Sequence, residues 1–360
     1  NIASHGIQAL ILAYFTALIF GFDSVTTYIM IFFVVGYSLY LVSPGLNGTE
    51  NKGGGIMQFL YKKRIIIIAI ILILTVWFLW RYAVKPMYVN AVINSAEKSG
   101  NCGYRLESME KMLKLRSFID PYLRLKYIEH IKSCSKYIER DEISYIKKAV
   151  DALKEAVRID PNYTRGWIIL AQFNNTLFVM ENDPQKKETL NKDNDYYIGM
   201  AKRLSPKRQE IYAAEAGIYF TRGDFPNMKR VSEECVKIDA NAASCYWYLG
   251  LAEIILGDGA QGEKDIETAK EGREYNNETS WNQMALAYTI NKNYGKLVPI
   301  YVRLTELSNN IDYFYTLAFL YRETGEYGKA KRIAEKIIEI NPAAKDEVNE
   351  FLNTLPPNYR

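Results

Sequence analysis

The sequence predicts an all-α protein in which about three transmembrane helices precede an α-solenoid of repeated helical hairpins. Three observations predict this fold class. Long apolar segments fill most of the first 84 residues, a period of roughly 34 residues runs through the C-terminal half, and glycine, proline and asparagine recur where helices of such a period should end.

The apolar segment at residues 65–84 is the strongest candidate for a membrane span. It begins IIIIAIILILTVWFLW and contains one charged side chain, Arg81. Twenty helical residues rise about 30 Å, the thickness of the hydrocarbon core of a bilayer. Trp77, Trp80 and Tyr82 lie at its C-terminal end, where aromatic rings favour the membrane interface. We therefore expect a transmembrane helix here.

Residues 1–42 hold two further apolar runs, Gly6–Phe22 and Val25–Val42, which predict a transmembrane hairpin. Asp23 lies in the turn between them, where capping a helix is a simpler role than chemistry at membrane depth. The loop at 43–64 carries four basic residues, so the positive-inside rule favours a cytoplasmic loop and extracytoplasmic repeats. These features predict an integral inner-membrane protein with the lipid bilayer as a partner.

Charge is unevenly distributed and argues against nucleic-acid binding. The formal net charge of +4 comes from residues 1–85, and the remainder of the chain is balanced. A nucleic-acid-binding domain needs an excess of basic side chains on one face. No nucleic-acid partner is therefore expected. The sequence also begins without methionine inside an apolar run, so we expect a C-terminal fragment of a longer protein.

The four cysteines are too few for a disulfide-dense scaffold. Cys102 with Cys134, and Cys235 with Cys245, could form two disulfides if the domain is extracytoplasmic. The alternative is that all four are reduced cysteines buried in helix packing, a common position for this residue type.

A repeat is visible beyond residue 140. A large aromatic residue, here called the anchor, follows each helix end by several residues, and small residues follow the anchor. The helix-ending positions are Asp160-Pro161, Ser205-Pro206, Asp239-Ala240, Tyr275-Asn276, Asn309-Asn310 and Asn341-Pro342. The anchors are Trp167, Tyr212, Tyr246, Trp281 and Phe314. One long interval contains a polar insert around 181–195.

This pattern resembles the tetratricopeptide repeat, a pair of antiparallel helices. The best matches are Tyr246 with Leu249-Gly250 and Gly257, and Tyr321 with Gly325, Ala330, Ala334 and Pro342. The resemblance implies about five repeats and a terminal helix in a domain spanning 141–355, enough for a continuous core. Residues 85–140 predict helices at 85–98, 106–118 and 121–137, which would be degenerate repeats.

No catalytic, cofactor-binding or metal site is expected in this chain. The two histidines, His5 and His130, are isolated from any cysteine pair, and no metal-ligand spacing is present. The glycines at 53–55 follow no predicted strand, so they indicate a flexible loop rather than a phosphate-binding loop.

The apolar N-terminal region also resembles the C-terminal spans of the bacterial O-antigen ligase and O-antigen polymerase family. A Phe-x-Phe-Asp turn between two apolar runs, a basic loop and a last span carry the resemblance, in the order Tyr14-Phe15, Phe20 to Ser24, Tyr28 and Phe32-Phe33. The family implies an enzyme that transfers or polymerises a polyprenyl-diphosphate-linked glycan. Its catalytic loop lies upstream of these spans, so this chain would be inactive alone.

Two functional hypotheses remain open. In the first, the chain is part of a ligase or polymerase whose repeat domain binds a protein partner near a lipid-linked glycan. In the second, it is a non-catalytic, membrane-anchored adaptor for an envelope complex. Both place a protein or peptide partner in a groove formed by the first helices of the repeats. The predicted groove residues are Asn174, Tyr219, Glu253, Tyr288 and Tyr321. The alternative is that several of these tyrosines pack between helices.

Overall fold

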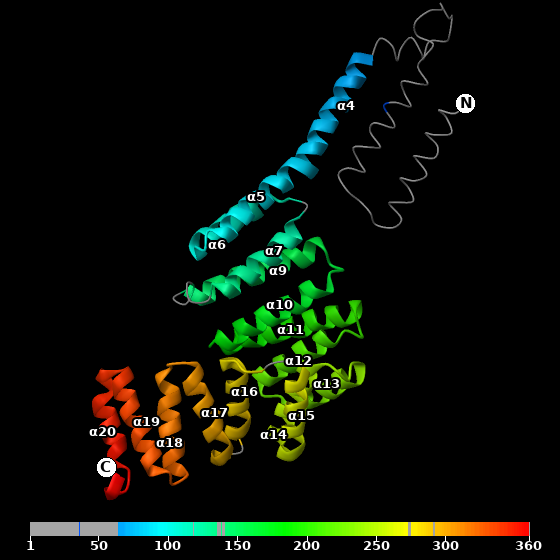
Figure 1. The fold of residues 1–360 in the computed structure, drawn as a ribbon. Coiled ribbons are helices and arrows are strands. Elements are labelled where there is room, and N and C mark those ends of the chain that lie inside the picture. Colours follow the sequence, from blue (N-terminus) through cyan, green and yellow to red (C-terminus); the bar gives the residue numbers. More distant parts are fainter. Residues whose placement is uncertain are drawn as a thin grey trace, which may run out of the picture. The chain divides into compact units, whose positions relative to one another are not determined.

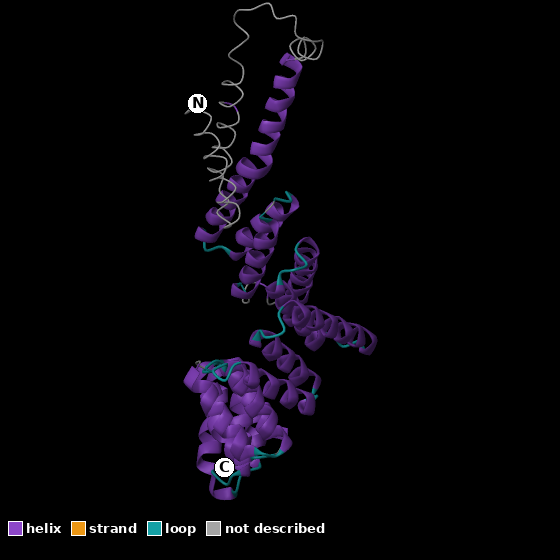
Figure 2. Cartoon of the chain, turned by 90° about the vertical axis from the view of Figure 1, so that its right-hand side faces the viewer, coloured by secondary structure: helices purple, strands orange, loops and turns teal. Residues whose placement is uncertain are grey.

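The structure is a computed structural model, and it describes residue 36 and residues 64–117, 119–134, 138, 141–272, 275–290 and 292–359. In this part of the chain the regular elements are helices, and no strand occurs (Figure 2). Backbone packing divides the chain into two compact units, Asn1–Leu123 and Arg124–Arg360. The predicted all-α repeat architecture is confirmed for the described residues.

The first unit contains a run of helices that begins with α4 (Arg64–Leu79) and the π-helical η1 (Trp80–Val84). They are followed by α5 (Lys85–Lys98) and α6 (Cys102–Lys114), and α7 (Asp120–Ser133) crosses the boundary between the units. Three helices are therefore present where three were predicted. Helix α6 begins earlier than predicted because the Asn101 side chain accepts a hydrogen bond from the Tyr104 amide at 2.9 Å and caps the helix.

The structure corrects the prediction of transmembrane helices. Within the described residues, no helix combines the length and the hydrophobicity that crossing a bilayer requires. The regular α-helix α4 has 16 residues, and the chain continues from it into the π-helical η1. Residues 1–42, the predicted hairpin, lie outside the described residues. The same finding contradicts the predicted integral inner-membrane localisation with extracytoplasmic repeats, and the bilayer as a partner stays a prediction.

The second unit is an array of antiparallel helical hairpins, which Figure 1 shows in chain order. Helix α9 (Glu142–Ile159) precedes five hairpins, each made of a first helix A and a second helix B. The helices A are α10 (Thr164–Met180), α12 (Gln209–Arg222), α14 (Ala243–Leu256), α16 (Glu278–Ile290) and α18 (Ile311–Glu323). The helices B are α11 (Pro184–Leu204), α13 (Phe225–Ile238), α15 (Gly259–Gly272), α17 (Tyr294–Leu307) and α19 (Tyr327–Ile340). A terminal α20 (Lys345–Asn353) follows.

The polar insert lengthens a helix instead of forming a loop. Helix α11 has 21 residues, whereas α13 has 14. The Asp183 side chain accepts hydrogen bonds from the amides of Gln185 and Lys186, and Pro184 occupies the first helical position, where its missing N–H costs nothing. Lysine, glutamate and asparagine then continue the helix toward solvent.

The turn between α12 and α13 shows how a hairpin closes. Gly223 has a φ of +73°, a left-handed conformation that an L side chain would strain. The amides of Gly223 and Asp224 donate to the carbonyls of Phe220 and Tyr219 and satisfy the end of α12. The Asp224 carboxylate then accepts the Asn227 amide and begins α13. One dipeptide thus ends one helix and starts the next.

The hydrophobic core runs between helices A and B of successive hairpins. One continuous cluster includes Trp247, Leu251 and Ile254 of α14, Ile266 of α15 and Leu304 of α17, all at most 2% exposed. Burying one such side chain contributes about 1.5–3 kcal/mol, so the stability of each hairpin depends on its neighbours.

Two glycines set the distance between α14 and α15. A Cβ atom on Gly250 would lie 2.5 Å from the Gly262 carbonyl oxygen, and one on Gly262 would lie 2.5 Å from the Gly250 oxygen. Both obstacles are backbone atoms that cannot rotate away. The helices therefore pack at a distance that only glycine permits at this crossing.

We predict that Gly250→Ala lowers the free energy of unfolding by about 1–3 kcal/mol, because overpacking forces the backbones apart. The matched control is Gly199→Ala in α11, where an added Cβ meets nothing within 4 Å. There the loss of glycine's backbone freedom should stabilise the helix by about 0.5–1 kcal/mol. Urea unfolding followed by circular dichroism measures both, and equal shifts in the two variants would contradict the close crossing.

Candidate functional site

The five predicted groove residues lie on helices A, one on each. The exposed fraction is 0% for Asn174, 5% for Glu253, 5% for Tyr288 and 8% for Tyr321, and Tyr219 is half-buried. Their side chains therefore contact mainly other helices of the repeat domain. Contact of these five residues with a partner stays a prediction.

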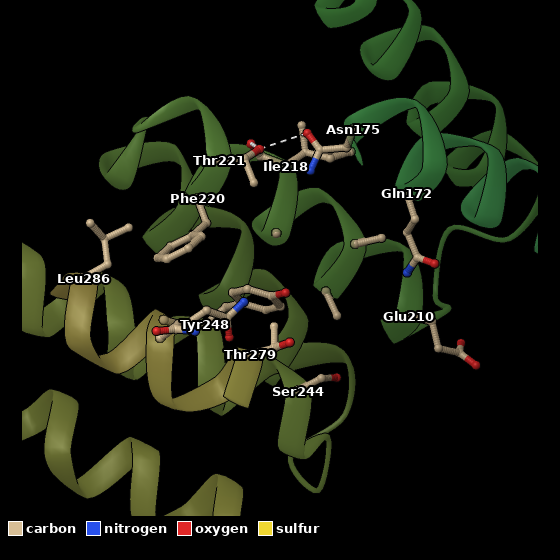
Figure 3. A pocket seen from close by; sticks show the side chains of 15 residues that line it. Gln172, Asn175, Glu210, Ile218, Phe220, Thr221, Ser244, Tyr248, Thr279 and Leu286 are labelled. Carbon is tan, nitrogen blue, oxygen red and sulfur yellow. Dashed lines mark hydrogen bonds between the residues drawn. The ribbon is translucent and has the colours of Figure 1, made fainter. Parts of the chain in front are cut away.

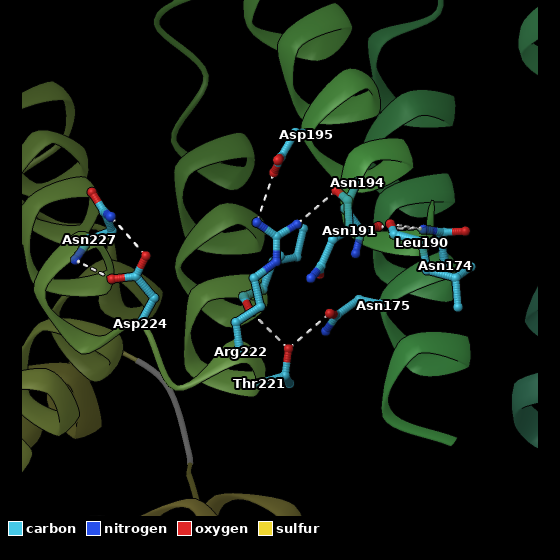
Figure 4. A network of polar contacts seen from close by, with 11 residues as sticks. Asn174, Asn175, Leu190, Asn191, Asn194, Asp195, Thr221, Arg222, Asp224 and Asn227 are labelled. Carbon is cyan, nitrogen blue, oxygen red and sulfur yellow. Dashed lines mark hydrogen bonds and ion pairs between the residues drawn. The ribbon is translucent and has the colours of Figure 1, made fainter. Parts of the chain in front are cut away.

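Asn174 belongs to a polar network between α10, α11 and α12 (Figure 4). Its Nδ2 atom donates to Asn194 Oδ1 at 2.8 Å. On the next helix, the Arg222 guanidinium donates to the Asp195 carboxylate at 2.9 Å and to the Asn191 carbonyl oxygen at 2.9 Å. These bonds join the long α11 to α10 and α12.

Glu253 lies in a buried carboxyl cluster formed by α13, α14 and α15. Burial raises its pKa to about 7, and the neighbouring Asp265 adds to the rise, while Lys229 opposes it. The Lys229 ammonium lies 3.2 Å from a Glu253 oxygen. Gln261 Nε2 donates to both Asp265 oxygens at 3.2 Å. The cluster places a titrating group inside the helix packing.

The two predicted tyrosines of α16 and α18 have different environments. The Tyr288 hydroxyl donates to the Glu263 carboxylate at 2.9 Å, and Lys296 pairs with the same carboxylate at 2.7 Å. Burial raises the pKa of the Tyr288 hydroxyl, so it keeps its proton at neutral pH. Tyr321 packs in a hydrophobic cluster, with the Lys329 ammonium 5.3 Å from its ring centroid.

An open groove of about 710 Å³ lies along four consecutive helices A (Figure 3). Its size is typical of a ligand site. Its lining combines amide and hydroxyl side chains with small and apolar ones, and it contains one charged residue, Glu210. The lining residues are Gln172 and Asn175 of α10; Glu210, Ala213, Ala214, Gly217, Ile218, Phe220 and Thr221 of α12; Ser244 and Tyr248 of α14; and Thr279, Asn282, Gln283 and Leu286 of α16.

The part of the groove lining that α12 supplies includes residues with small side chains or none. Ala213, Ala214 and Gly217 follow one another along it, and a Cβ on Gly217 would lie 2.9 Å from the Tyr248 hydroxyl oxygen. The Tyr248 ring therefore lies against α12 at this position (Figure 3). A bound chain can approach α12 closely at Ala213, whereas Tyr248 already covers Gly217.

The spacing from the anchor residues explains why the five predicted residues do not line the groove. Each predicted residue follows its anchor by seven positions, as Tyr288 follows Trp281, and seven residues return to about the same helix face. That face packs against other helices. Many groove residues instead lie at −2, +1, +5 or +8 from the anchor, as Thr279, Asn282 and Leu286 do. At ~100° per residue these positions form one stripe about 80–160° around the helix. This stripe is the signal in the sequence that could have found the groove.

The described residues hold no group of three or more histidine, cysteine, aspartate or glutamate side chains that could bind a metal ion. The strongly shifted pKa of Glu253 belongs to a residue outside the groove lining.

Cys235 and Cys245 form a disulfide, so one of the two predicted pairs is confirmed. It joins α13 to α14, with a Cα–Cα distance of 5.7 Å, within the usual range for disulfides. Cys235 lies in a small hydrophobic cluster together with Ala242 and Cys245. The pairing of Cys102 with Cys134 stays a prediction.

Comparison with solved structures finds helical repeat proteins at low identity. TTC0263, a thermophilic tetratricopeptide repeat protein of Thermus thermophilus, is 13% identical with a TM-score of 0.42, covering 56% of this chain and 98% of that one. PilW, a type IV pilus biogenesis factor, is 12% identical with a TM-score of 0.49, covering 65% and 97%. PilF of Pseudomonas aeruginosa is 16% identical with a TM-score of 0.41, covering 61% and 94%.

No curated protein sequence matches the chain significantly. The tetratricopeptide repeat family model matches residues 311–343, which comprise α18 and α19. This is the hairpin of the predicted match from Tyr321 to Pro342. Residues 311–343 therefore form a tetratricopeptide repeat.

The Glu253 cluster predicts a pH dependence of stability. The folded chain holds the Glu253 proton up to about pH 7, whereas an unfolded glutamate releases it near its ordinary pKa of about 4.3. Because the folded state binds more protons in this window, the contribution of Glu253 to stability is full below the window and is lost as pH rises through it. Glu253→Gln should flatten this dependence.

The measurement is the urea midpoint of the wild type and the variant at several pH values between these limits. The exposed Glu271→Gln on α15 is the control, because it removes a carboxylate outside the cluster. If Glu253→Gln and Glu271→Gln keep the same pH slope as the wild type, the assignment of the proton to Glu253 is wrong.

Proposed function

We propose that this chain is a non-catalytic adaptor whose tetratricopeptide repeat domain binds a protein or peptide segment in the groove along α10, α12, α14 and α16. The observation that carries the proposal is the open groove, whose mixed polar and apolar lining faces solvent while the opposite faces of the same helices form the core. Stacked helical repeats present extended surfaces of this kind to polypeptides.

The rigidity of the groove supports this function. Helices α12 and α14 are held by core residues that are almost fully buried, such as Ile211 and Leu251. The disulfide fixes the start of α14 beside Ser244, which lines the groove. A preformed site loses less conformational entropy on binding than a flexible one.

The O-antigen ligase and polymerase hypothesis has no support in the described residues. The motif that carries that resemblance, residues 14–33, lies outside them. The catalytic loop of that family would precede the same motif. A lipid-linked glycan substrate therefore stays a prediction from the resemblance, and the adaptor hypothesis fits the observed groove better.

The test is affinity capture from the native host with the full chain as bait. Leu286, 43% exposed, lines the groove on α16, and Leu307, 37% exposed, ends helix B α17 outside it. We expect at least one polypeptide to be retained by the wild type and by Leu307→Arg but depleted about tenfold with Leu286→Arg, a loss of ~1.4 kcal/mol. Quantitative mass spectrometry measures the depletion.

A photo-crosslinking residue placed at 286 or at 307 gives the control. Crosslinks to the captured polypeptide should form from position 286 and not from 307. The proposal is overturned if every retained polypeptide is insensitive to Leu286→Arg, or if it crosslinks only from position 307.

A further inference from the structure

The orientation of the Gln283 amide is fixed by the core behind the groove. Trp247 Nε1 donates to Gln283 Oε1 at 2.7 Å. The indole N–H is a donor only, so the amide must present its oxygen there. Trp247 is 2% exposed and stacks on Tyr275 with ring centroids 4.1 Å apart. The Gln283 nitrogen, with two donor hydrogens, is thus the part of the amide left for a ligand.

The neighbouring Asn282 is fixed in the opposite sense. The Tyr313 hydroxyl donates to the Glu278 carboxylate at 2.6 Å, so its oxygen accepts from Asn282 Nδ2 at 2.7 Å. Burial raises the pKa of the Tyr313 hydroxyl, which keeps the proton that this arrangement needs. The Asn282 carbonyl oxygen remains as an acceptor. Adjacent residues therefore offer a donor and an acceptor of fixed identity.

A peptide main chain is the ligand that matches this pair. Each peptide unit carries one N–H donor and one C=O acceptor. Gln172 and Asn175 on α10 supply further amides to the same groove. The small side chain of Ala213 leaves room for a main chain on α12, next to the point where the Tyr248 ring covers Gly217.

The charge of the groove excludes a strongly charged ligand. Glu210 is its one charged lining residue, and Arg208 binds both carboxylate oxygens at 2.8 and 3.2 Å. The hydrogen bond from Arg208 lowers the pKa of Glu210, so the pair stays ionised and internally neutralised. A charged side chain in the groove would lose water without gaining an unpaired counter-charge.

Phe220 and Leu286 give the groove an apolar end beside Tyr248 (Figure 3). Burying one apolar side chain of a ligand against this patch makes the free energy of binding more favourable. We infer that the groove binds an extended, uncharged peptide segment through its main chain, with one aliphatic or aromatic residue against Phe220 and Leu286. This inference rests on the proposed function, and it adds the chemistry of the partner.

The first experiment selects short random phage-displayed peptides on the immobilised full chain and retests them on Leu286→Arg. We expect groove-dependent peptides without net charge that carry at least one Leu, Ile, Phe or Met. Groove-dependent peptides with a strong net charge would overturn this inference and leave the adaptor proposal standing. Failure to enrich any groove-dependent peptide would count against both, and the host capture would then decide the adaptor proposal separately.

The second experiment separates main-chain from side-chain recognition. Each backbone amide of the best peptide is replaced in turn by an ester, which removes one N–H donor and keeps the side chains. At one position we expect about a fivefold loss of affinity, as for the loss of one hydrogen bond of ~1 kcal/mol. The loss should disappear in Asn282→Ala and persist in Asn182→Ala, outside the groove.

Gln283→Glu tests the donor half of the pair. The carboxylate can still accept the Trp247 N–H but cannot donate, so affinity for the same peptide should fall at least fivefold, by ~1 kcal/mol or more. Gln185→Glu on α11 makes the same chemical change away from the groove and should have no effect. Unchanged affinity in Gln283→Glu, or ester effects that are the same in Asn282→Ala, would show recognition by side chains alone.

Discussion

The close packing of each helix A against its helix B is the constraint on which this domain depends. A single helix of 14 residues such as α14 is at best marginally stable alone in water, and most of its residues are buried by its neighbours. Where α14 meets α15, Gly250 and Gly262 let the two backbones approach to a distance that no side chain at either position would allow. The pair then forms a surface on which α13 and α16 can pack, so each hairpin is stabilised by the next.

The same packing controls the chemistry of the groove. Trp247 is a core residue, yet its indole N–H decides which half of the Gln283 amide is free. Tyr313 of the following hairpin does the same for Asn282. Groove polarity is therefore set by side chains that a ligand never touches. An isolated hairpin would lack these contacts, because each orienting residue belongs to a neighbouring repeat.

Buried polar groups serve the architecture rather than the groove. The bonds of Asn174 and Arg222 hold the lengthened α11 in place, and the carboxyl cluster at Glu253 joins three helices. Both clusters are costly to bury unless their partners are aligned. Their bonds link neighbouring helices on the side away from the groove lining.

Local signals in the sequence determined the helical hairpins and the positions of their ends. Dipeptides such as Gly223-Asp224 end one helix and cap the next through bonds within a few residues, so their effect does not depend on distant parts of the chain. The Cys235–Cys245 pair was also predictable, because a short turn keeps both residues close. Hydrophobicity alone misled at residues 65–84, where the regular α-helix ends at Leu79 and a π-helical turn follows.

The sequence contains the stripe of each helix A that lines the groove, but only the tertiary structure showed that the residues seven positions after each anchor are the buried ones. Asn174, Glu253 and Tyr288 look like surface groups in the sequence, but they lie two turns from an anchor and turn inward with it. The free halves of the Asn282 and Gln283 amides likewise depend on residues 31 and 36 positions away in the chain. A linear sequence states which side chains are polar, whereas the folded contacts determine which of their atoms remain free to bind.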